Sequence, residues 1–154
     1  GLIGSYHIIY NSYLRDRVCM EGKMTHYNSM NVLSMHALIA AYSKEGMEWV
    51  DELRTVLDTN ISYAMEFIRR EFPGVSVSRP QGTYMLFLDC TDWCEAHHQT
   101  IEELQRAGVE VGVIWQDGRP FHGACHIRMN LALPFSRVQE AFHRLDKYVF
   151  RAES

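Results

Sequence analysis

Residues 49–74 read WVDELRTVLDTNISYAMEFIRREFPG, and this stretch decides the fold. Its side chains recur at helical spacing until Pro73 and Gly74 stop the pattern. The recurring positions are Trp49, Leu53, Val56, Leu57, Asn60, Ile61, Ala64, Phe67, Ile68 and Phe72. A helix of about 28 residues is about 40 Å long, whereas a compact domain of 154 residues has a radius of gyration of about 15 Å. The helix is therefore expected to form a spine between two layers or domains.

Downstream of Gly74 the pattern changes to short strands and two amphipathic helices. We expect strands over residues 75–79, 84–89, 109–115 and 126–133, the first two joined by the turn Pro80-Gln81-Gly82. One helix is predicted from Thr100 to Gly108, with Glu103 in a capping-box relation, and another from Ser136, with Gln139 three residues on. This half of the chain is therefore predicted to be a ββαββα unit, an α+β pair of layers.

Upstream of the long helix, the opening residues GLIGSYHIIYN alternate in the manner of a strand over residues 6–10, which would need a sheet to join. A short helix is expected over residues 12–22, followed by a polar loop over residues 23–29. Residues 31–43 are apolar almost all round, so that helix is predicted to be buried or to lie in an interface, with Gly46 as its C-terminal cap.

Composition bounds the function classes. The 154 residues are 47% hydrophobic, enough for one real core, and the net charge is -4 without a basic stripe, so nucleic acid is not an expected partner. No run approaches the roughly 18 apolar residues of a membrane helix, and no signal peptide is evident, so we expect a cytoplasmic protein that does not bind membranes. Because the chain starts at Gly1 rather than at a methionine, we expect it to be a fragment.

The cysteines are irregularly spaced, which favours free thiols over a disulfide framework. They are Cys19, Cys90, Cys94 and Cys125. Cys90 and Cys94, followed by His97 and His98, form a weak zinc pattern because no second ligand pair accompanies them. No metal is therefore predicted.

Arg128 is the most informative polar residue. In the predicted strand HIRMNLALP, Arg128 and Asn130 alternate with apolar residues and so share the face opposite the core. A guanidinium there could bind a carboxylate through two parallel hydrogen bonds. From composition alone, an arginine paired with a nearby acid is the more ordinary interpretation. Tyr84, at the start of the second predicted strand, is ordinarily a packing residue.

Four segments, taken in order, resemble one family. GLIGSYHIIYN resembles the segment that follows the cofactor-binding lysine in class I and II aminotransferases and cystathionine β-lyases. Residues 29–63 resemble their interface helix and interdomain helix, RPQGTYMLFLD their small-domain strand pair, and HIRMNLALP their carboxylate-binding strand. The resemblance covers essentially the whole chain.

This resemblance implies the fold type I architecture of pyridoxal-phosphate enzymes. Residues 1–46 would be a remnant of the large domain, residues 47–74 the interdomain helix and residues 75–154 the small C-terminal domain. It also implies a homodimer that acts on amino acids. The lysine that forms a Schiff base with pyridoxal phosphate would lie about six residues before Gly1, so the chain alone is expected to be inactive and to carry no catalytic or cofactor-binding residue.

Within the resemblance, Arg128 matches the arginine that grips the substrate α-carboxylate, with Asn130 and Tyr84 as further substrate-binding candidates. Many aminotransferases have a phosphate-binding arginine at the position of Ile3, and its absence favours the C-S lyase branch. The predicted function is therefore amino-acid transamination or β-elimination of cystathionine-like substrates by the full-length enzyme. The alternatives are a stand-alone amino-acid-binding regulatory module and a dimerisation module.

Overall fold

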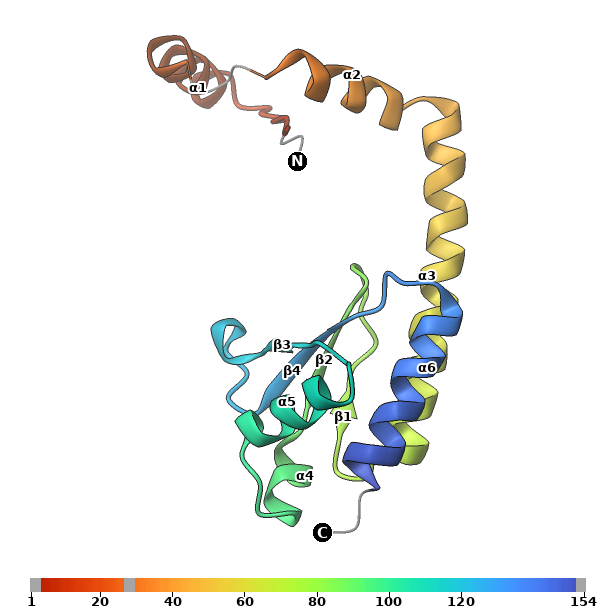
Figure 1. Cartoon of the computed structure of the whole chain (residues 1–154). Helices are drawn as coiled ribbons and strands as arrows, with labels where there is room; N and C mark the ends of the chain where they lie inside the picture. The colour runs from red at the N-terminus through yellow and green to blue at the C-terminus, as the bar shows by residue number, and fades with distance from the viewer. Residues whose placement is uncertain (1–3, 27–29, 152–154) are drawn as a thin grey trace. The chain divides into compact units, whose positions relative to one another are not determined.

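The computed structural model describes residues 4–26 and 30–151, and the chain divides into two compact units, Gly1–Glu52 and Leu53–Ser154. Ile3, at the position where many aminotransferases have a phosphate-binding arginine, lies outside the described residues. Helix α3, Lys44–Glu71, is 28 residues long and contributes to both units (Figure 1). The described helices include none that combines the length and apolar content required to cross a membrane.

The first unit contains helices α1, Ser12–Thr25, and α2, Val32–Ala41. Each begins at an asparagine, Asn11 or Asn31, whose side chain accepts a backbone N–H three residues on. α1 continues into the segment predicted as a loop and ends at His26, which has a left-handed conformation.

Two predictions for this unit were wrong. Residues 6–10 form no strand, because no other described segment of the chain pairs with their backbone. Gly46 is not the cap of α2 but lies in the first turn of α3. A Cβ atom there would lie 2.5 Å from the carbonyl oxygens of Ala40 and Ala41, so a glycine is required where α3 starts against the end of α2.

The second unit contains a four-stranded antiparallel sheet of order β1-β2-β4-β3. The strands are β1 (Ser76–Val77), β2 (Met85–Asp89), β3 (Gln116–Asp117) and β4 (His126–Asn130). The helices are the C-terminal part of α3, α4 (Thr91–Ala96), α5 (Ile101–Glu110), the short 3₁₀ helix η1 (Arg119–Phe121), α6 (Phe135–Leu145) and the π-helical η2 (Asp146–Phe150). The predicted ββαββα layers are confirmed.

Local signals located some of these boundaries and missed others. The predicted capping box of α5 is present, with Thr100 and Glu103 bonded reciprocally. The strand predicted over residues 109–115 was wrong, because α5 extends to Glu110 and Gly112 then turns the backbone through a positive φ of 80°. α6 begins at Phe135 after Pro134 and has no side-chain cap, so the capping box predicted from Ser136 was also wrong.

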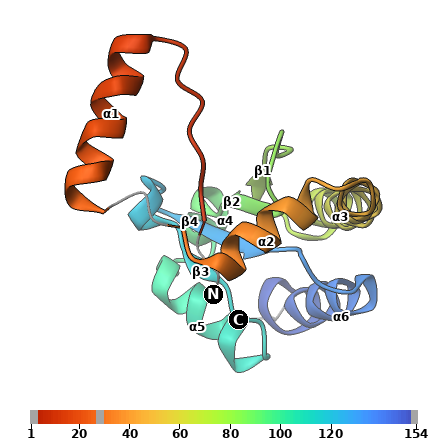
Figure 2. The same ribbon diagram turned by 90° about the horizontal axis from the view of Figure 1, so that it is seen from above.

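One face of the sheet carries the core. Leu86, Leu88, Ile127, Met129 and Leu131 are all at most 5% exposed, and they pack in one cluster with buried residues of the helices. Figures 1 and 2 both show α6 alongside the C-terminal part of α3. Aromatic rings join these two helices: Phe67–Phe142, Tyr63–Phe135 and Tyr63–Phe142.

Asn60 is the buried polar residue that links α3 to the end of β4. Its side chain is fully buried, and its Nδ2 donates to the carbonyl oxygens of Leu131 at 2.8 Å and Leu133 at 2.9 Å. β4 therefore ends earlier than the predicted strand of residues 126–133, and Leu133, predicted on the core face, is 48% exposed.

Candidate functional site

Arg128 lies in the middle of β4, on the face of the sheet opposite the core. Its cross-strand neighbours are Phe87 on β2 and Gln116 on β3. The guanidinium carbon lies 3.8 Å from the centre of the Phe121 ring, and Nη1 donates to Oε1 of Gln116 at 3.3 Å. Arg128 is partly exposed. The guanidinium is therefore held by an aromatic ring and a neutral amide.

No carboxylate among the described residues pairs with Arg128. The ordinary interpretation of Arg128, an ion pair with a nearby acid, is therefore without support in this part of the chain. By contrast, acidic partners are present for Arg70, Arg79, Arg119, Arg137, Arg144 and Arg151. The positive charge of Arg128 thus remains available to an anion on the open face of the sheet.

The segment from β3 to η1 places both partners of Arg128. Arg119 forms hydrogen bonds with both carboxylate oxygens of Asp117, at 2.9 and 3.0 Å from Nε, and also pairs with Glu102 on α5. These contacts hold the pKa of Asp117 below its usual range. Two backbone hydrogen bonds close the loop. The N–H of Gly118 donates to the carbonyl oxygen of His126 at 2.9 Å, and the N–H of Gly123 donates to the carbonyl oxygen of Gly118 at 3.1 Å.

The other two predicted site residues lie close to Arg128 along the sheet. Asn130 is exposed and on the same face as Arg128, opposite Met85, but its Oδ1 accepts the backbone N–H of Ala132 at 2.8 Å. The carbonyl oxygen of Tyr84 accepts a hydrogen bond from the backbone N–H of Leu131. Tyr84 therefore alternates in step with Leu86 and Leu88, the buried residues of β2. The sheet therefore places Arg128 and Asn130 on one face, whereas the alternation assigns Tyr84 to the opposite face.

Sequence reasoning missed Gln116 and Phe121, because neither residue lies in a predicted strand or helix. It also missed His126, whose ring lies tilted by 33° against that of Phe87 with ring centres 4.6 Å apart, and whose Nε2 is 3.9 Å from Oδ2 of Asp89. Hydrogen bonds from Thr91 are the main cause that lowers the pKa of Asp89. The available signal for Phe121 was an aromatic residue between Gly118 and Gly123, six residues beyond the strand predicted over residues 109–115.

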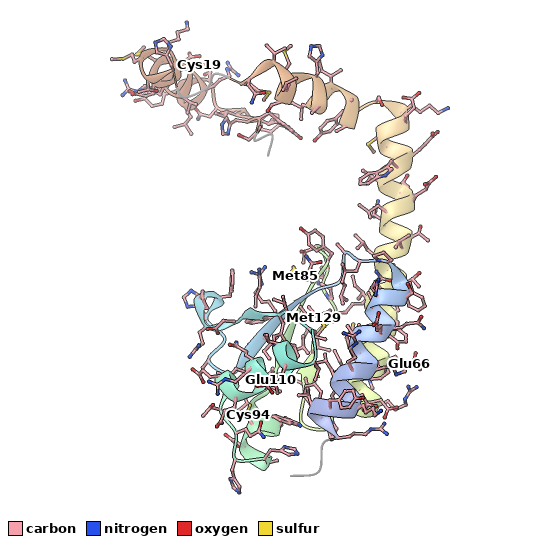
Figure 3. All side chains as sticks on the ribbon, in the orientation of Figure 1. Cys19, Glu66, Met85, Cys94, Glu110 and Met129 are labelled. Atoms are coloured by element: carbon pink, nitrogen blue, oxygen red, sulfur yellow. The ribbon has the colours of Figure 1, made fainter. Side chains whose placement is uncertain are left out.

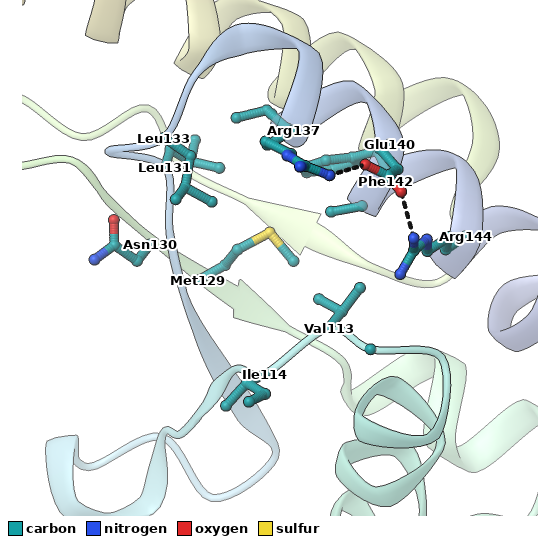
Figure 4. A pocket seen from close by; sticks show the side chains of 13 residues that line it. Val113, Ile114, Met129, Asn130, Leu131, Leu133, Arg137, Glu140, Phe142 and Arg144 are labelled. Carbon is teal, nitrogen blue, oxygen red and sulfur yellow. Dashed lines mark hydrogen bonds and ion pairs between the residues drawn. The ribbon is translucent and has the colours of Figure 1, made fainter.

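A pocket of about 380 Å³ lies beside the end of β4, against Met129, Asn130 and Leu131. Its floor is apolar, from Val113, Met129 and Phe142, and Arg137 and Arg144 at its rim both pair with Glu140 (Figure 4). Of the three predicted site residues, Asn130 lines this pocket and Arg128 and Tyr84 do not.

Three cysteines meet in the second unit. Cys94 lies on α4 (Figure 3), and the backbone N–H of Cys90 donates to the carbonyl oxygen of Cys125 at 2.9 Å. Burial, helped by Cys125, raises the pKa of Cys94 to about 12, and burial raises that of Cys90 as well. These thiols are therefore protonated and poor nucleophiles at neutral pH. Across the described ranges, no group of histidine, cysteine or acidic side chains could hold a metal ion.

The lysines of this chain all lie on helices. The lysines in the sequence are Lys23, Lys44 and Lys147. Lys23 lies in α1, Lys44 begins α3 and Lys147 lies in η2, and all are exposed. None of them belongs to the sheet face that carries Arg128.

Comparisons with known proteins place the chain among its relatives. No family model matches the chain. Protein MalY of Escherichia coli K12 is 30% identical over 146 residues, covering 91% of this chain and 36% of that protein. Cystathionine beta-lyase PatB of Bacillus subtilis 168 is 28% identical over 148 residues, covering 94% and 37%. The chain therefore spans just over a third of the length of these relatives.

Among solved structures, cystalysin from Treponema denticola, which contains a pyridoxal 5'-phosphate cofactor, superposes with a TM-score of 0.77. It is 25% identical, with 92% of this chain and 36% of that chain covered. The sequence likeness and the shared fold cover both units of the chain. The chain therefore corresponds to the C-terminal part of the fold type I pyridoxal-phosphate-dependent enzymes, the group that includes aminotransferases and C-S lyases.

Proposed function

We propose that the whole protein is a pyridoxal-phosphate-dependent C-S lyase that cleaves cystathionine-like amino acids, and that this chain supplies the site for their α-carboxylate. The observation that carries the proposal is the guanidinium of Arg128, which is oriented by its neighbours but paired with no described acid. The name of one relative, cystathionine beta-lyase PatB, favours lyase chemistry over amino transfer.

The division of labour follows from the groups that the chain contains. Bound pyridoxal phosphate supplies the electron sink that allows bonds at the substrate α-carbon to break. Arg128 would fix the carboxylate on that carbon through two parallel hydrogen bonds, which orients the bond to be broken. We propose that the 154 residues are inactive by themselves, because none of their lysines belongs to the sheet that carries Arg128.

The reaction is tested by incubating the whole protein with cystathionine, and separately with common amino acids plus a keto acid. Release of pyruvate and thiol supports the lyase, whereas amino transfer without thiol release would replace it with an aminotransferase. Binding of amino acids with neither reaction would favour a regulatory module, the alternative from another class.

Arg128 is tested in the same protein. Arg128→Ala removes a charge from the open face without disturbing the core, and losing one partner of a desolvated ion pair costs about 2 to 5 kcal/mol. We therefore expect kcat/KM to fall by about 30-fold or more. Arg128→Lys should recover only part of it, because an ammonium lacks the two-pronged geometry. An alanine variant with the parent's kcat and KM would remove Arg128 from the site.

We also propose that the protein forms a homodimer. The support comes from α2, where Val32, Leu33 and Ile39 are 64%, 67% and 63% exposed and Ser34 is its only buried residue. A helix with so apolar a surface is typical of an interface. A cytoplasmic location belongs to the same proposal.

A further inference from the structure

We propose that Gln116 and Phe121 are positioning residues that hold the Arg128 guanidinium in place while leaving its charge unneutralised, so that the substrate carboxylate is its counter-ion. This inference rests on the proposed function of Arg128 and adds the residues that make the site specific for a carboxylate. It follows from three features of the sheet face: an aromatic platform, a neutral cross-strand partner and an acid directed elsewhere.

The aromatic platform is Phe121. Its ring centre lies 3.8 Å from the guanidinium carbon, within the range of a cation–π contact. Phe121 is 50% exposed and is not part of the core cluster, so packing does not explain its position. A guanidinium lying over a ring keeps its in-plane donors free, and these are the donors that a carboxylate uses.

The neutral partner is Gln116, which lies directly across from Arg128 in the β3–β4 register. An amide oxygen accepts one hydrogen bond from Nη1 and so fixes the rotation of the guanidinium. A carboxylate at the same position would form an ion pair and compete with the substrate. The next residue, Asp117, is acidic, but it alternates to the other face of the strand.

Asp117 is also bound by Arg119. Asp117 is bonded by Arg119 on both oxygens, and Arg119 also engages Glu102. The loop is closed tightly, since a Cβ atom on Gly123 would lie 2.5 Å from the ring of Phe87 and 2.6 Å from His126. η1 is therefore anchored at both ends, and Phe121 is presented to Arg128 from a rigid support.

The kinetic test uses Phe121→Leu, Phe121→Tyr and Gln116→Glu in the whole protein, with Arg128→Ala measured beside them. Phe121→Leu should raise the KM for cystathionine about three- to tenfold and leave kcat within about twofold, as expected for lost ground-state binding. Phe121→Tyr should retain the parent's KM. Gln116→Glu should raise KM about tenfold or more, and added salt should reduce this effect because it screens the new ion pair.

Two matched controls separate positioning from general damage. Tyr148→Leu removes an aromatic ring of similar exposure, 55%, whose cation–π contact is with Lys147 instead. Gln99→Glu adds the same charge on an exposed residue after α4. Both should keep the parent's KM. A second readout is the Nε–H resonance of Arg128 in the 154-residue chain, which the Phe121 ring should shift upfield and which should lose that shift in Phe121→Leu only.

The outcomes distinguish this inference from the proposed function. If Arg128→Ala keeps the parent's KM, the function proposed for Arg128 fails. If Arg128→Ala loses activity while Phe121→Leu and Gln116→Glu behave like their controls, only the present inference is overturned. Should Phe121→Leu not fold, a salt-sensitive rise in KM for Gln116→Glu still supports the inference, and a parental KM for it refutes the inference.

Discussion

Replacing Asn60 is expected to cost more stability than any other single polar change in α3 for which the structure shows a role. In Asn60→Ala the carbonyls of Leu131 and Leu133 lose donors at 2.8 and 2.9 Å. Leu131 is 2% exposed, so water cannot replace the lost bond there, whereas Leu133 is 48% exposed. The lost hydrogen bond therefore costs more stability at Leu131 than at Leu133.

The magnitude follows from these two environments. A buried carbonyl left without a partner costs about 1 to 3 kcal/mol, and a bond that water can replace about 1 kcal/mol or less. The vacated side-chain volume adds to this cost. We expect Asn60→Ala to lower the free energy of unfolding by about 2 to 4 kcal/mol.

Asn60→Asp tests whether the donor or the packing matters. The shape is kept, but a carboxylate would face two carbonyl oxygens, so a loss of at least the same size is expected at neutral pH. Burial should raise the pKa of the introduced carboxyl above its unfolded value, so its ionisation costs stability. This variant should regain stability relative to the parent as the pH falls, because the protonated acid can donate one bond.

Urea unfolding followed by tryptophan fluorescence measures these changes, since Trp93 and Trp115 are buried in this unit. Thr59→Ala is the matched control: its hydroxyl bonds only the exposed helix backbone at Thr55 and should matter by less than about 0.5 kcal/mol. An Asn60→Ala variant within that margin of the parent would show that the two bonds do not hold α3 to β4.

Three further outcomes are expected. Because the pKa of Cys94 in the folded state is raised to about 12, its contribution to stability should be complete below the ordinary thiol pKa. Above that pH the free energy of unfolding should fall by up to about 1.4 kcal/mol per pH unit. In urea titrations Cys94→Ala should remove this pH dependence, whereas Cys19→Ala, at an exposed site, should not. Gly108→Ala should cost about 1 to 3 kcal/mol in the same assay, since its Cβ would overlap the Trp115 ring, while Gly82→Ala, with open space, should cost less than about 0.5 kcal/mol. In sedimentation velocity the chain should run as a dimer, and a clean monomer at high concentration would contradict the interface proposed for α2.

The sequence predicted those elements whose cause is local. The 28-residue helix α3 and the α5 capping box depend on periodicity and on residues three apart, and both are present. The alternation in HIRMN correctly separated Ile127 and Met129 from Arg128, because the strand period is two.

What the sequence did not predict depends on contacts distant in the chain. The β-like pattern of residues 6–10 forms no strand because a strand needs a partner, and the described chain supplies none there. Phe121 and Gln116 become neighbours of Arg128 only through the β3–β4 register. No spacing rule connects a 3₁₀ turn to a residue seven positions later across a loop.

The register of β4 links the stability of the fold to the proposed site. A slip of one residue would turn Arg128 into the core and Ile127 or Met129 outward, because neighbouring strand residues face opposite sides. Asn60 resists such a slip, since its two donors meet the carbonyls of Leu131 and Leu133, two residues apart, and a shift by one would misplace both. In the whole protein, Asn60→Ala should therefore weaken substrate binding as well as stability, although Asn60 lies on the core side of the sheet. A variant that loses stability but keeps the parent's KM would show that pairing of β4 with β2 fixes the register without help from α3.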